Sequence, residues 1–336
     1  MDLNGKKILI TCGGGLGDMI CFTPALRRMK ELYPTCQITF MTKYGNHEIL
    51  EGLSYIDQVI YIRRGKFMGR YRVLPYFVGQ DAVIFTDWQP QLLLCSKLLG
   101  IPIRAGIPRP GHHLNRYLTR HLQTNVMKSR DYAAETNARL FSEALDVQLD
   151  GDMTKLDIAP LTQAVCDRVD EKLQAIGLGA ADRFLLLSPF ANFEKRNWPI
   201  AAAADFVERV ESGLGLPVVI TGPRDKAAEA GKLSSYNLMG NTTTSELAEL
   251  IRRAACLVTP DSGPMHVAGA VGTPVAALFS KDLPSRWAPR ERCVPITLNF
   301  SCSPCNDEAA NACPHGNQCM RGITAEMVYE AVRHII

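Results

Sequence analysis

The sequence of 336 residues has no apolar run long enough to cross a bilayer, no fixed-period repeat and no low-complexity tract. Its first residues, MDLNGKKILITC, lack the apolar stretch and small-residue cleavage site of a secretory signal. We therefore expect a cytoplasmic protein, in which the eleven cysteines are reduced thiols or metal ligands and not disulfides. A chain of this length suits two domains better than one.

Net charge is also small, since 37 Lys and Arg stand against 34 Asp and Glu, and this argues against a nucleic-acid partner. The distribution is uneven: residues 1–160 hold 20 basic and 15 acidic side chains, with segments 61–72 and 101–121 basic and free of acids. Such runs usually form a solvated face. They can also hold a phosphorylated or membrane-borne acceptor. The candidate acceptor-binding residues are Arg63, Arg64, Arg109, Arg116 and Arg120.

Strand and helix patterns alternate along the chain, which predicts parallel α/β sheets. The polar, proline-ended stretch 150–160 predicts a linker, with one domain over 1–160 and a second over 161–336. We expect two facing Rossmann-like domains with a cleft between the carboxyl ends of their strands. Expected strands cover 7–12, 37–42, 58–62, 82–85, 101–106, 184–188, 217–221, 257–259 and 275–279, with a short strand end at 237–240. Expected helices cover 19–33, 91–99, 133–145, 161–176, 200–212, 245–255, 265–271 and 324–336.

The first strand is followed by a glycine-rich turn, CGGGLGDM, in which Gly15 and Gly17 let the backbone approach a ligand closely. The turn does not satisfy the dinucleotide fingerprint G-x-G-x-x-G, because Asp18 occupies the last position, and no ribose-binding acid follows the second strand. A nicotinamide enzyme is therefore a poor fit. Asp18 is either a helix cap or a carboxylate that takes a proton from an attacking hydroxyl.

Three loops of the second domain carry groups suited to a diphosphate. Ser188 ends a strand, and Lys195 and Arg196 follow it as fixed positive charge for a leaving group. Asp225, after the next strand, is a weak candidate for a ribose contact. The turn Pro260–Pro264 leads into a small-residue helix, whose N-terminal amides would point out of the carboxyl edge of the sheet, where anions bind. An ordinary crossover without a ligand is the alternative for this turn.

The stretches LGDM, a basic residue before Trp-Pro, and PDSGPMHVAGAVGTPVAALF occur in this order and resemble glycosyltransferase family 9 over nearly the whole chain. The best-known members of that family are ADP-heptose:lipopolysaccharide heptosyltransferases. The resemblance implies a GT-B fold and an inverting, metal-independent transfer from a nucleotide sugar, with Asp18 as the base. It places Arg196 where the family usually has lysine, with Lys195 one position out of register. It also implies that the donor diphosphate site is lined by Asp261, Ser262, Gly263 and His266.

From the same resemblance we expect ADP-heptose as donor, a lipopolysaccharide core sugar or related glycan or glycolipid as acceptor, and no catalytic cofactor. The enzyme would then work in the cytoplasm, in peripheral contact with the inner membrane surface. Its last helix, 324–336, would pack back on the first domain, with a plain core helix of the second domain as the alternative. The alternatives are a nucleotide-sugar epimerase of GT-B architecture and a non-catalytic scaffold stabilised by a metal. The acid-free basic segments favour transfer over epimerisation, because an epimerase needs no acceptor surface.

Four cysteines are gathered near the C-terminus, at Cys302, Cys305, Cys313 and Cys319. Four thiolates at this spacing can close a tetrahedral site for zinc or a single iron. Some members of the resembling family carry a similar set with an apparently structural role, and His315 is a spare ligand candidate. A reduced, metal-free loop is the alternative.

Overall fold

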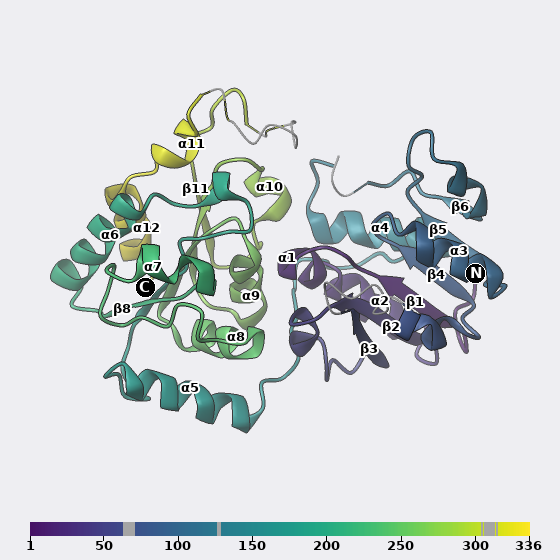
Figure 1. The fold of residues 1–336 in the computed structure, drawn as a ribbon, viewed down its shortest axis with the longest axis horizontal. Coiled ribbons are helices and arrows are strands. Elements are labelled where there is room, and N and C mark those ends of the chain that lie inside the picture. The colour runs from purple at the N-terminus through teal and green to yellow at the C-terminus, as the bar shows by residue number, and fades with distance from the viewer. Residues whose placement is uncertain (63–70, 126–128, 304, 306–312, 314) are drawn as a thin grey trace. The chain divides into compact units, whose positions relative to one another are not determined.

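The computed structural model describes residues 1–62, 71–125, 129–303, 305, 313 and 315–336, and its chain forms two compact units (Figure 1). The first is Met1–Pro160 and the second is Leu161–Ile336. In the described part of the chain, no helix is long and apolar enough to cross a membrane.

The first unit is built on a six-stranded parallel sheet in the order β3-β2-β1-β4-β5-β6. The strands are β1 (Lys7–Thr11), β2 (Gln37–Lys43), β3 (Gln58–Ile62), β4 (Ala82–Phe85), β5 (Ile103–Gly106) and β6 (Arg120–His121). The helices are α1 (Leu16–Ile20), α2 (Thr23–Leu32), α3 (Pro90–Leu98) and α4 (Ala133–Leu145), with 3-10 turns η1 (Asn46–Ile49), η3 (Tyr71–Phe77) and η4 (His113–Tyr117). The chain order of the strands reverses beside β1, so the loops after β1 and β4 meet at the edge where open α/β sheets bind ligands.

The helix expected over 19–33 is in fact two helices. α1 ends at Ile20 and α2 begins at Thr23, because Pro24 has no N–H to continue the helical ladder. The Thr23 hydroxyl donates to the Ile20 carbonyl at 2.7 Å and satisfies the end of α1. The single-helix prediction is therefore wrong, although its C-terminal limit before Pro34 is right.

The second unit has a five-stranded parallel sheet in the order β11-β10-β9-β7-β8. The strands are β7 (Leu185–Leu187), β8 (Val218–Ile220), β9 (Cys256–Pro260), β10 (Val275–Phe279) and β11 (Cys293–Thr297). The helices are α5 (Gln163–Ala175), α6 (Ile200–Gly213), α7 (Ala227–Ala230), α8 (Thr244–Arg253), α9 (Gly263–Val271), α10 (Pro284–Trp287), α11 (Gln318–Arg321) and α12 (Ala325–Ile335), with 3-10 turns η5 (Glu194–Arg196) and η6 (Arg224–Lys226). The expected strand end at 237–240 is only an isolated bridge between Ile220 and Asn237, and β11 was not expected.

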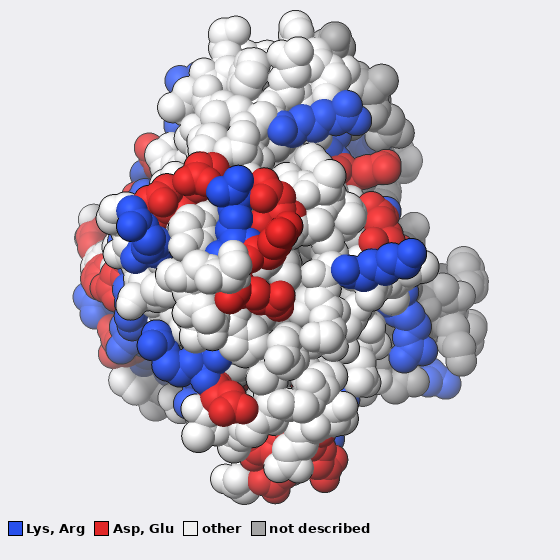
Figure 2. Space-filling model, turned by 90° about the vertical axis from the view of Figure 1, so that its left-hand side faces the viewer, with Lys and Arg blue, Asp and Glu red and all other residues white. Residues whose placement is uncertain are grey.

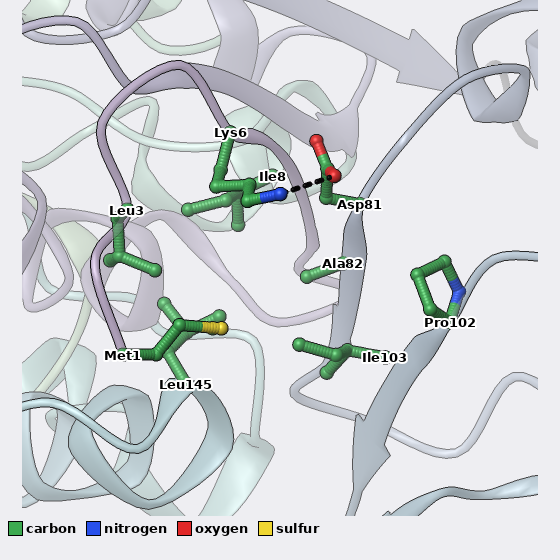
Figure 3. A pocket seen from close by; sticks show the side chains of 9 residues that line it. All are labelled: Met1, Leu3, Lys6, Ile8, Asp81, Ala82, Pro102, Ile103 and Leu145. Carbon is green, nitrogen blue, oxygen red and sulfur yellow. Dashed lines mark hydrogen bonds and ion pairs between the residues drawn. The ribbon is translucent and has the colours of Figure 1, made fainter.

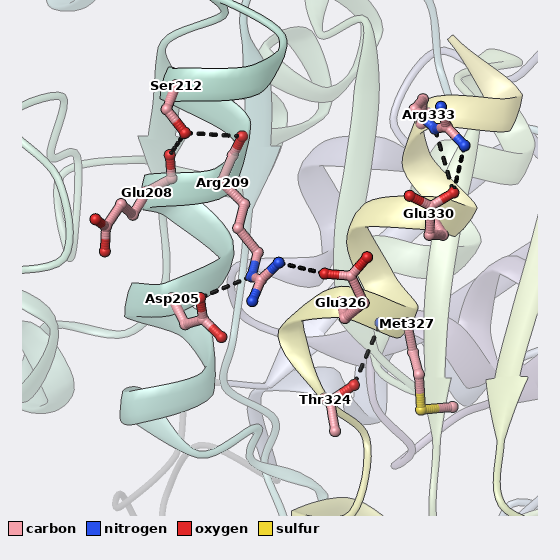
Figure 4. A network of polar contacts seen from close by, with 9 residues as sticks. All are labelled: Asp205, Glu208, Arg209, Ser212, Thr324, Glu326, Met327, Glu330 and Arg333. Atoms are coloured by element: carbon pink, nitrogen blue, oxygen red, sulfur yellow. Dashed lines mark hydrogen bonds and ion pairs between the residues drawn. The ribbon is translucent and has the colours of Figure 1, made fainter.

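Helix α12 closes the core of the second unit. Thr324 caps it by accepting from the Met327 amide at 3.3 Å, and its buried Val328 and Val332 join the hydrophobic core beneath α6. On the surface, Arg209 of α6 pairs with Glu326 of α12 (Figure 4). Acidic and basic side chains lie next to one another over the face that carries α6 (Figure 2). The expected return of α12 to the first unit stays a prediction.

A cavity of 220 Å³ lies in the first unit, with Ile8, Asp81, Ile103 and Leu145 among its lining residues (Figure 3). Ile8 and Ile103 stand at the amino-terminal ends of β1 and β5. The cavity is therefore at the opposite edge of the sheet from the loop that carries Asp18, and it is not part of the candidate site.

Candidate active site

In the first unit, Asp18 is held at the carboxyl edge of the sheet by the glycine loop. It is the third residue of α1, and its Oδ2 accepts a hydrogen bond from the Gly15 amide at 2.7 Å. A Cβ at position 14 would lie 2.7 Å from the same oxygen, so the close approach requires glycine there. Gly17 is buried inside α1. Asp18 therefore caps the helix and remains half-buried at the ligand-binding edge, so the two interpretations of its role are compatible.

A second carboxylate on this loop was missed from the sequence. Asp87 follows β4, is exposed, and accepts a hydrogen bond from the Gly13 amide at 2.9 Å and another from the Gln89 side chain at 2.8 Å. A Cβ at position 13 would lie 2.3 Å from its Oδ2. The signal in the sequence was an acidic residue that follows a buried strand. This residue can be placed beside the glycine loop only when β4 is known to pair with β1.

Both carboxylates affect the pKa of the buried Cys12 thiol. Burial raises the pKa of Cys12 to about 12, and the negative charges of Asp18 and Asp87 contribute in the same direction. Cys12 is thus a neutral thiol at physiological pH and not a nucleophile.

The candidate acceptor-binding arginines fall into three groups. Arg63 and Arg64 lie outside the described residues. Arg109 is exposed, and Arg116 is exposed beside Tyr117, whose hydroxyl accepts from its guanidinium at 3.1 Å. Arg120 donates to the carbonyl of Ala144 at 2.8 Å, and so supports the end of α4. Of the five candidates, Arg109 and Arg116 are therefore the described arginines whose exposed side chains can meet a solvent-borne partner.

In the second unit, the carboxyl ends of β7, β9 and β10 carry the candidate donor residues. Ser188 is buried directly after β7, and its amide donates to the Val258 carbonyl of β9 at 2.9 Å. Ser262 is the N-cap of α9, but its hydroxyl donates back to the Pro260 carbonyl at 3.0 Å and does not cap the helix. Pro264 has no N–H and the Met265 amide donates to the Ser262 carbonyl at 3.1 Å, so the Gly263 amide is the group at the start of α9 that can meet an anion at this edge. Asp225 is exposed in η6 after β8.

Arg196 is held by two acidic residues of this edge. Its guanidinium donates to the Asp261 carbonyl at 2.9 Å, lies 3.5 Å from the Asp261 carboxylate, and pairs with Asp282. Asp282, which was missed from the sequence, follows β10, so the arginine joins the loops after β7, β9 and β10. Lys195 is half-buried beside it, and its carbonyl accepts from the Asn317 amide group at 2.9 Å.

Lys281 is a third cation at this edge that the sequence did not single out. Its ammonium lies 5.1 Å from the centre of the Phe193 ring, and the Arg196 guanidinium lies 5.3 Å from the same ring. Phe193 is 58% exposed, so it gathers two positive charges at the solvent-facing rim of the donor loops.

His266 contributes no positive charge to the donor site. It is buried in α9, and burial, with the nearby charge of Arg196, lowers its pKa to about 4. Its ring meets Trp287 edge-on, with centroids 6.0 Å apart. A neutral histidine can orient a ligand or its neighbours through hydrogen bonds, but it cannot balance the charge of a diphosphate.

Residues 94–314 match the model of glycosyltransferase family 9 (heptosyltransferase). The matched region is well over half of the chain. The chain belongs to glycosyltransferase family 9. It is therefore a glycosyltransferase.

Among curated relatives of this family 9 transferase is the lipooligosaccharide heptosyltransferase 2 of Haemophilus influenzae, 42% identical over 303 residues, which cover 84% of this chain and 86% of the relative. The structure of the ADP-heptose lps heptosyltransferase II of E. coli matches with a TM-score of 0.76 at 20% identity, over 98% of both chains. The iron-containing dodecameric glycosyltransferase TibC of enterotoxigenic E. coli matches with a TM-score of 0.63 at 16% identity, over 100% of this chain and 77% of that one. These structures confirm the expected GT-B fold.

The four C-terminal cysteines of the transferase are free thiols, and some of them raise the pKa of a neighbouring thiol. Burial raises the pKa values of Cys305 and Cys319, and the neighbouring thiols raise them further. Hydrogen bonds from the backbone of Asn317 and His315 lower the pKa of Cys313. Among the residues with described positions, no three potential ligands are close enough together to hold a metal ion.

Proposed function

We propose that this transferase moves heptose from ADP-heptose to a hydroxyl of a lipopolysaccharide core or related glycan, with inversion at the anomeric carbon and without a catalytic metal. The observation that carries the choice of sugar is the 42% identity to a lipooligosaccharide heptosyltransferase over most of both chains. The two edges described above supply groups for each part of the reaction.

On the acceptor side, Asp18 takes the proton of the attacking hydroxyl as its oxygen forms a bond to the anomeric carbon. The Gly15 amide fixes the Asp18 side chain through one carboxylate oxygen, Oδ2. Such fixing reduces the motion that must be frozen when the reacting groups align. A carboxylate can remove this proton directly, so the step requires no metal-bound water.

On the donor side, the bond between the anomeric carbon and the diphosphate breaks, and its electron pair leaves with the nucleoside diphosphate. The Gly263 amide at the start of α9 and the cations Lys195 and Lys281 stabilise the growing negative charge. Because Arg196 already pairs with Asp261 and Asp282, we assign it to holding the donor loops, and Lys195 to the diphosphate itself.

The direct test supplies purified protein with ADP-heptose and a lipid-free core oligosaccharide, and follows ADP release and the anomeric configuration of the product by NMR. We expect ADP only when the acceptor is present, an inverted product, and full activity in EDTA. A change of donor configuration without acceptor would instead indicate an epimerase. Retention of configuration at the anomeric carbon, or a loss of activity in EDTA that added Mg²⁺ or Mn²⁺ restores, would contradict the mechanism.

We further propose that Cys302, Cys305, Cys313 and Cys319 hold a structural zinc or iron. Four mutually interacting thiols form a suitable donor set for either metal, although binding requires them to draw closer together than they are in the described structure. Elemental analysis of protein purified without chelators should find about one zinc or iron per chain, and replacement of two of these cysteines by serine should remove it. Absence of stoichiometric metal in the wild type would contradict this proposal.

We also propose a cytoplasmic location with peripheral contact at the inner membrane surface, through Arg109, Arg116 and their neighbours. Cell fractionation at low and high salt tests this, since an electrostatic contact is released by salt. A protein that is found outside the cytoplasmic and membrane fractions would contradict it.

A further inference from the structure

Three aromatic rings lie together at the carboxyl ends of β2 and β3, farther along the edge that carries Asp18. Tyr44 directly follows β2, Tyr61 lies near the end of β3, and His47 lies in η1. The ring centroids are 5.4 Å apart for Tyr44 and Tyr61, 5.3 Å for Tyr44 and His47, and 4.1 Å for His47 and Tyr61. Each ring therefore contacts both others.

The cluster faces solvent instead of filling the core. Tyr44 is 55% exposed and Tyr61 is 37% exposed, and none of the three belongs to the buried core of the unit. A stacking group built for stability gains most when it is buried, whereas exposed aromatic rings with polar atoms suit a partner that is apolar on one face and polar at its rim.

The backbone holds the three rings in place. The Tyr44 amide donates to the Ile62 carbonyl at 3.1 Å, which keeps the ends of β2 and β3 together. Gly45 turns the chain with a φ of 93°, and its amide donates to Nδ1 of His47 at 3.1 Å. With Nδ1 accepting, neutral His47 carries its proton on Nε2, which can donate to a hydroxyl.

The cluster lies on the same edge of the sheet as Asp18. β1, β2 and β3 are neighbours in the sheet, so the end of β3 is about 10 Å from the end of β1 at ordinary strand spacing. Between them, the Thr42 hydroxyl contacts the sulfur of Met19 at 3.4 Å, and Met19 is the residue after Asp18. The rings are thus one sugar residue or more along the edge from the proposed base.

We propose that Tyr44, His47 and Tyr61 form a sugar-binding subsite for the acceptor glycan. This inference rests on the proposed glycosyl transfer to a glycan. A pyranose ring presents C–H groups on its faces and hydroxyls at its rim, so the aromatic faces pack on the former while the tyrosine hydroxyls and the imidazole N–H bond the latter. The subsite holds a sugar next to the one that is attacked, not the attacked residue itself.

The test compares Tyr44→Ala and His47→Ala with wild type, using a lipid-free core oligosaccharide and a monosaccharide acceptor. We expect the KM for the oligosaccharide to rise about threefold to tenfold, which corresponds to about 0.7 to 1.4 kcal/mol of lost binding. The kcat, the KM for the donor and the KM for the monosaccharide should not change. Tyr76→Ala is the control, because Tyr76 is an exposed tyrosine of the same unit that lies outside the cluster.

Saturation-transfer NMR on the oligosaccharide without donor provides a readout that does not need turnover. Wild type should saturate C–H protons of one sugar ring, and both variants should lose this signal while their melting temperatures stay at the wild-type value. An unchanged oligosaccharide KM together with unchanged NMR contacts would overturn the subsite. Failure of wild type to transfer to any glycan would overturn the proposed function instead, and the NMR arm would still decide whether these rings bind sugar.

Discussion

The Gly13 amide and the Asp87 carboxylate are joined by a 2.9 Å hydrogen bond that fixes the glycine loop after β1 to the loop after β4. Two residues farther on, the Gly15 amide binds Asp18. The same short glycine loop therefore positions both carboxylates. A substitution at Asp87 should also displace Asp18, and a substitution at Asp18 should also displace Asp87.

Asp87→Ala should lower kcat/KM by about tenfold to a hundredfold, because the loop that positions Asp18 loses its anchor. Asp87→Asn keeps an oxygen that can accept from the Gly13 amide and should retain more activity. Gly13→Ala should resemble the alanine variant, since the added Cβ would lie 2.3 Å from the Asp87 carboxylate. Steady-state kinetics test the series, with Asp131→Ala, an exposed acid paired with Arg139, as control. Full activity in Asp87→Ala would remove its positioning role.

Asp18→Asn should abolish turnover while leaving the affinity for the nucleotide nearly unchanged. Loss of a general base costs about a hundredfold to ten-thousandfold in rate. Asparagine can still accept from the Gly15 amide, so the helix cap is preserved. Turnover and calorimetric ADP binding are to be measured on the same preparation. A variant with full activity would show that Asp18 serves only as a cap.

Arg196→Met should destabilise the second unit by about 3 kcal/mol, because the largely buried carboxylates of Asp261 and Asp282 would lose the guanidinium that pairs with both. Lys195→Met should lower stability less than Arg196→Met and should weaken donor binding, since Lys195 is assigned to the diphosphate. Urea unfolding and ADP titration separate the two effects. Equal stability losses in both variants would contradict this division between the neighbouring cations.

Acid should destabilise the protein partly through His266. Its pKa is about 4 in the folded state and 6.5 ordinarily, so between these values the unfolded chain binds a proton that the folded chain does not. The stabilisation is complete above pH 6.5 and is lost as the pH falls toward 4, by at most about 3 kcal/mol. His266→Gln should flatten the dependence of unfolding free energy on pH over this range. Parallel curves for wild type and His266→Gln would contradict the assignment.

Much of the fold could be predicted because its signals are local. The strands β3 and β4 and the helix α4 begin and end at the expected residues, and α9 ends at Gly272, whose φ of 76° suits glycine. β11 was missed because its sequence, CVPIT, contains a proline and lies at the edge of the sheet, where proline is tolerated.

The site was less predictable, because its contacts join segments far apart in the chain. Asp87 matters only once β4 is known to pair with β1, and Asp282 only once β10 is known to stand beside β9. The sequence placed Arg196 near a diphosphate, but its two acidic partners come from loops 65 and 86 residues farther on. Charge and spacing in the sequence do not reveal that Arg196 is already paired with two carboxylates.

The cysteine-bearing segment is joined to the donor loops at several points. Asn317 donates to the Lys195 carbonyl, the Ser303 hydroxyl donates to the Ser280 carbonyl at 2.8 Å, and the Cys305 amide donates to the Lys281 carbonyl at 2.9 Å. Any event that reshapes this segment, including oxidation of its thiols, is therefore transmitted to two of the three cations at the donor edge. Two preparations of identical sequence but different thiol state should consequently differ in their affinity for ADP.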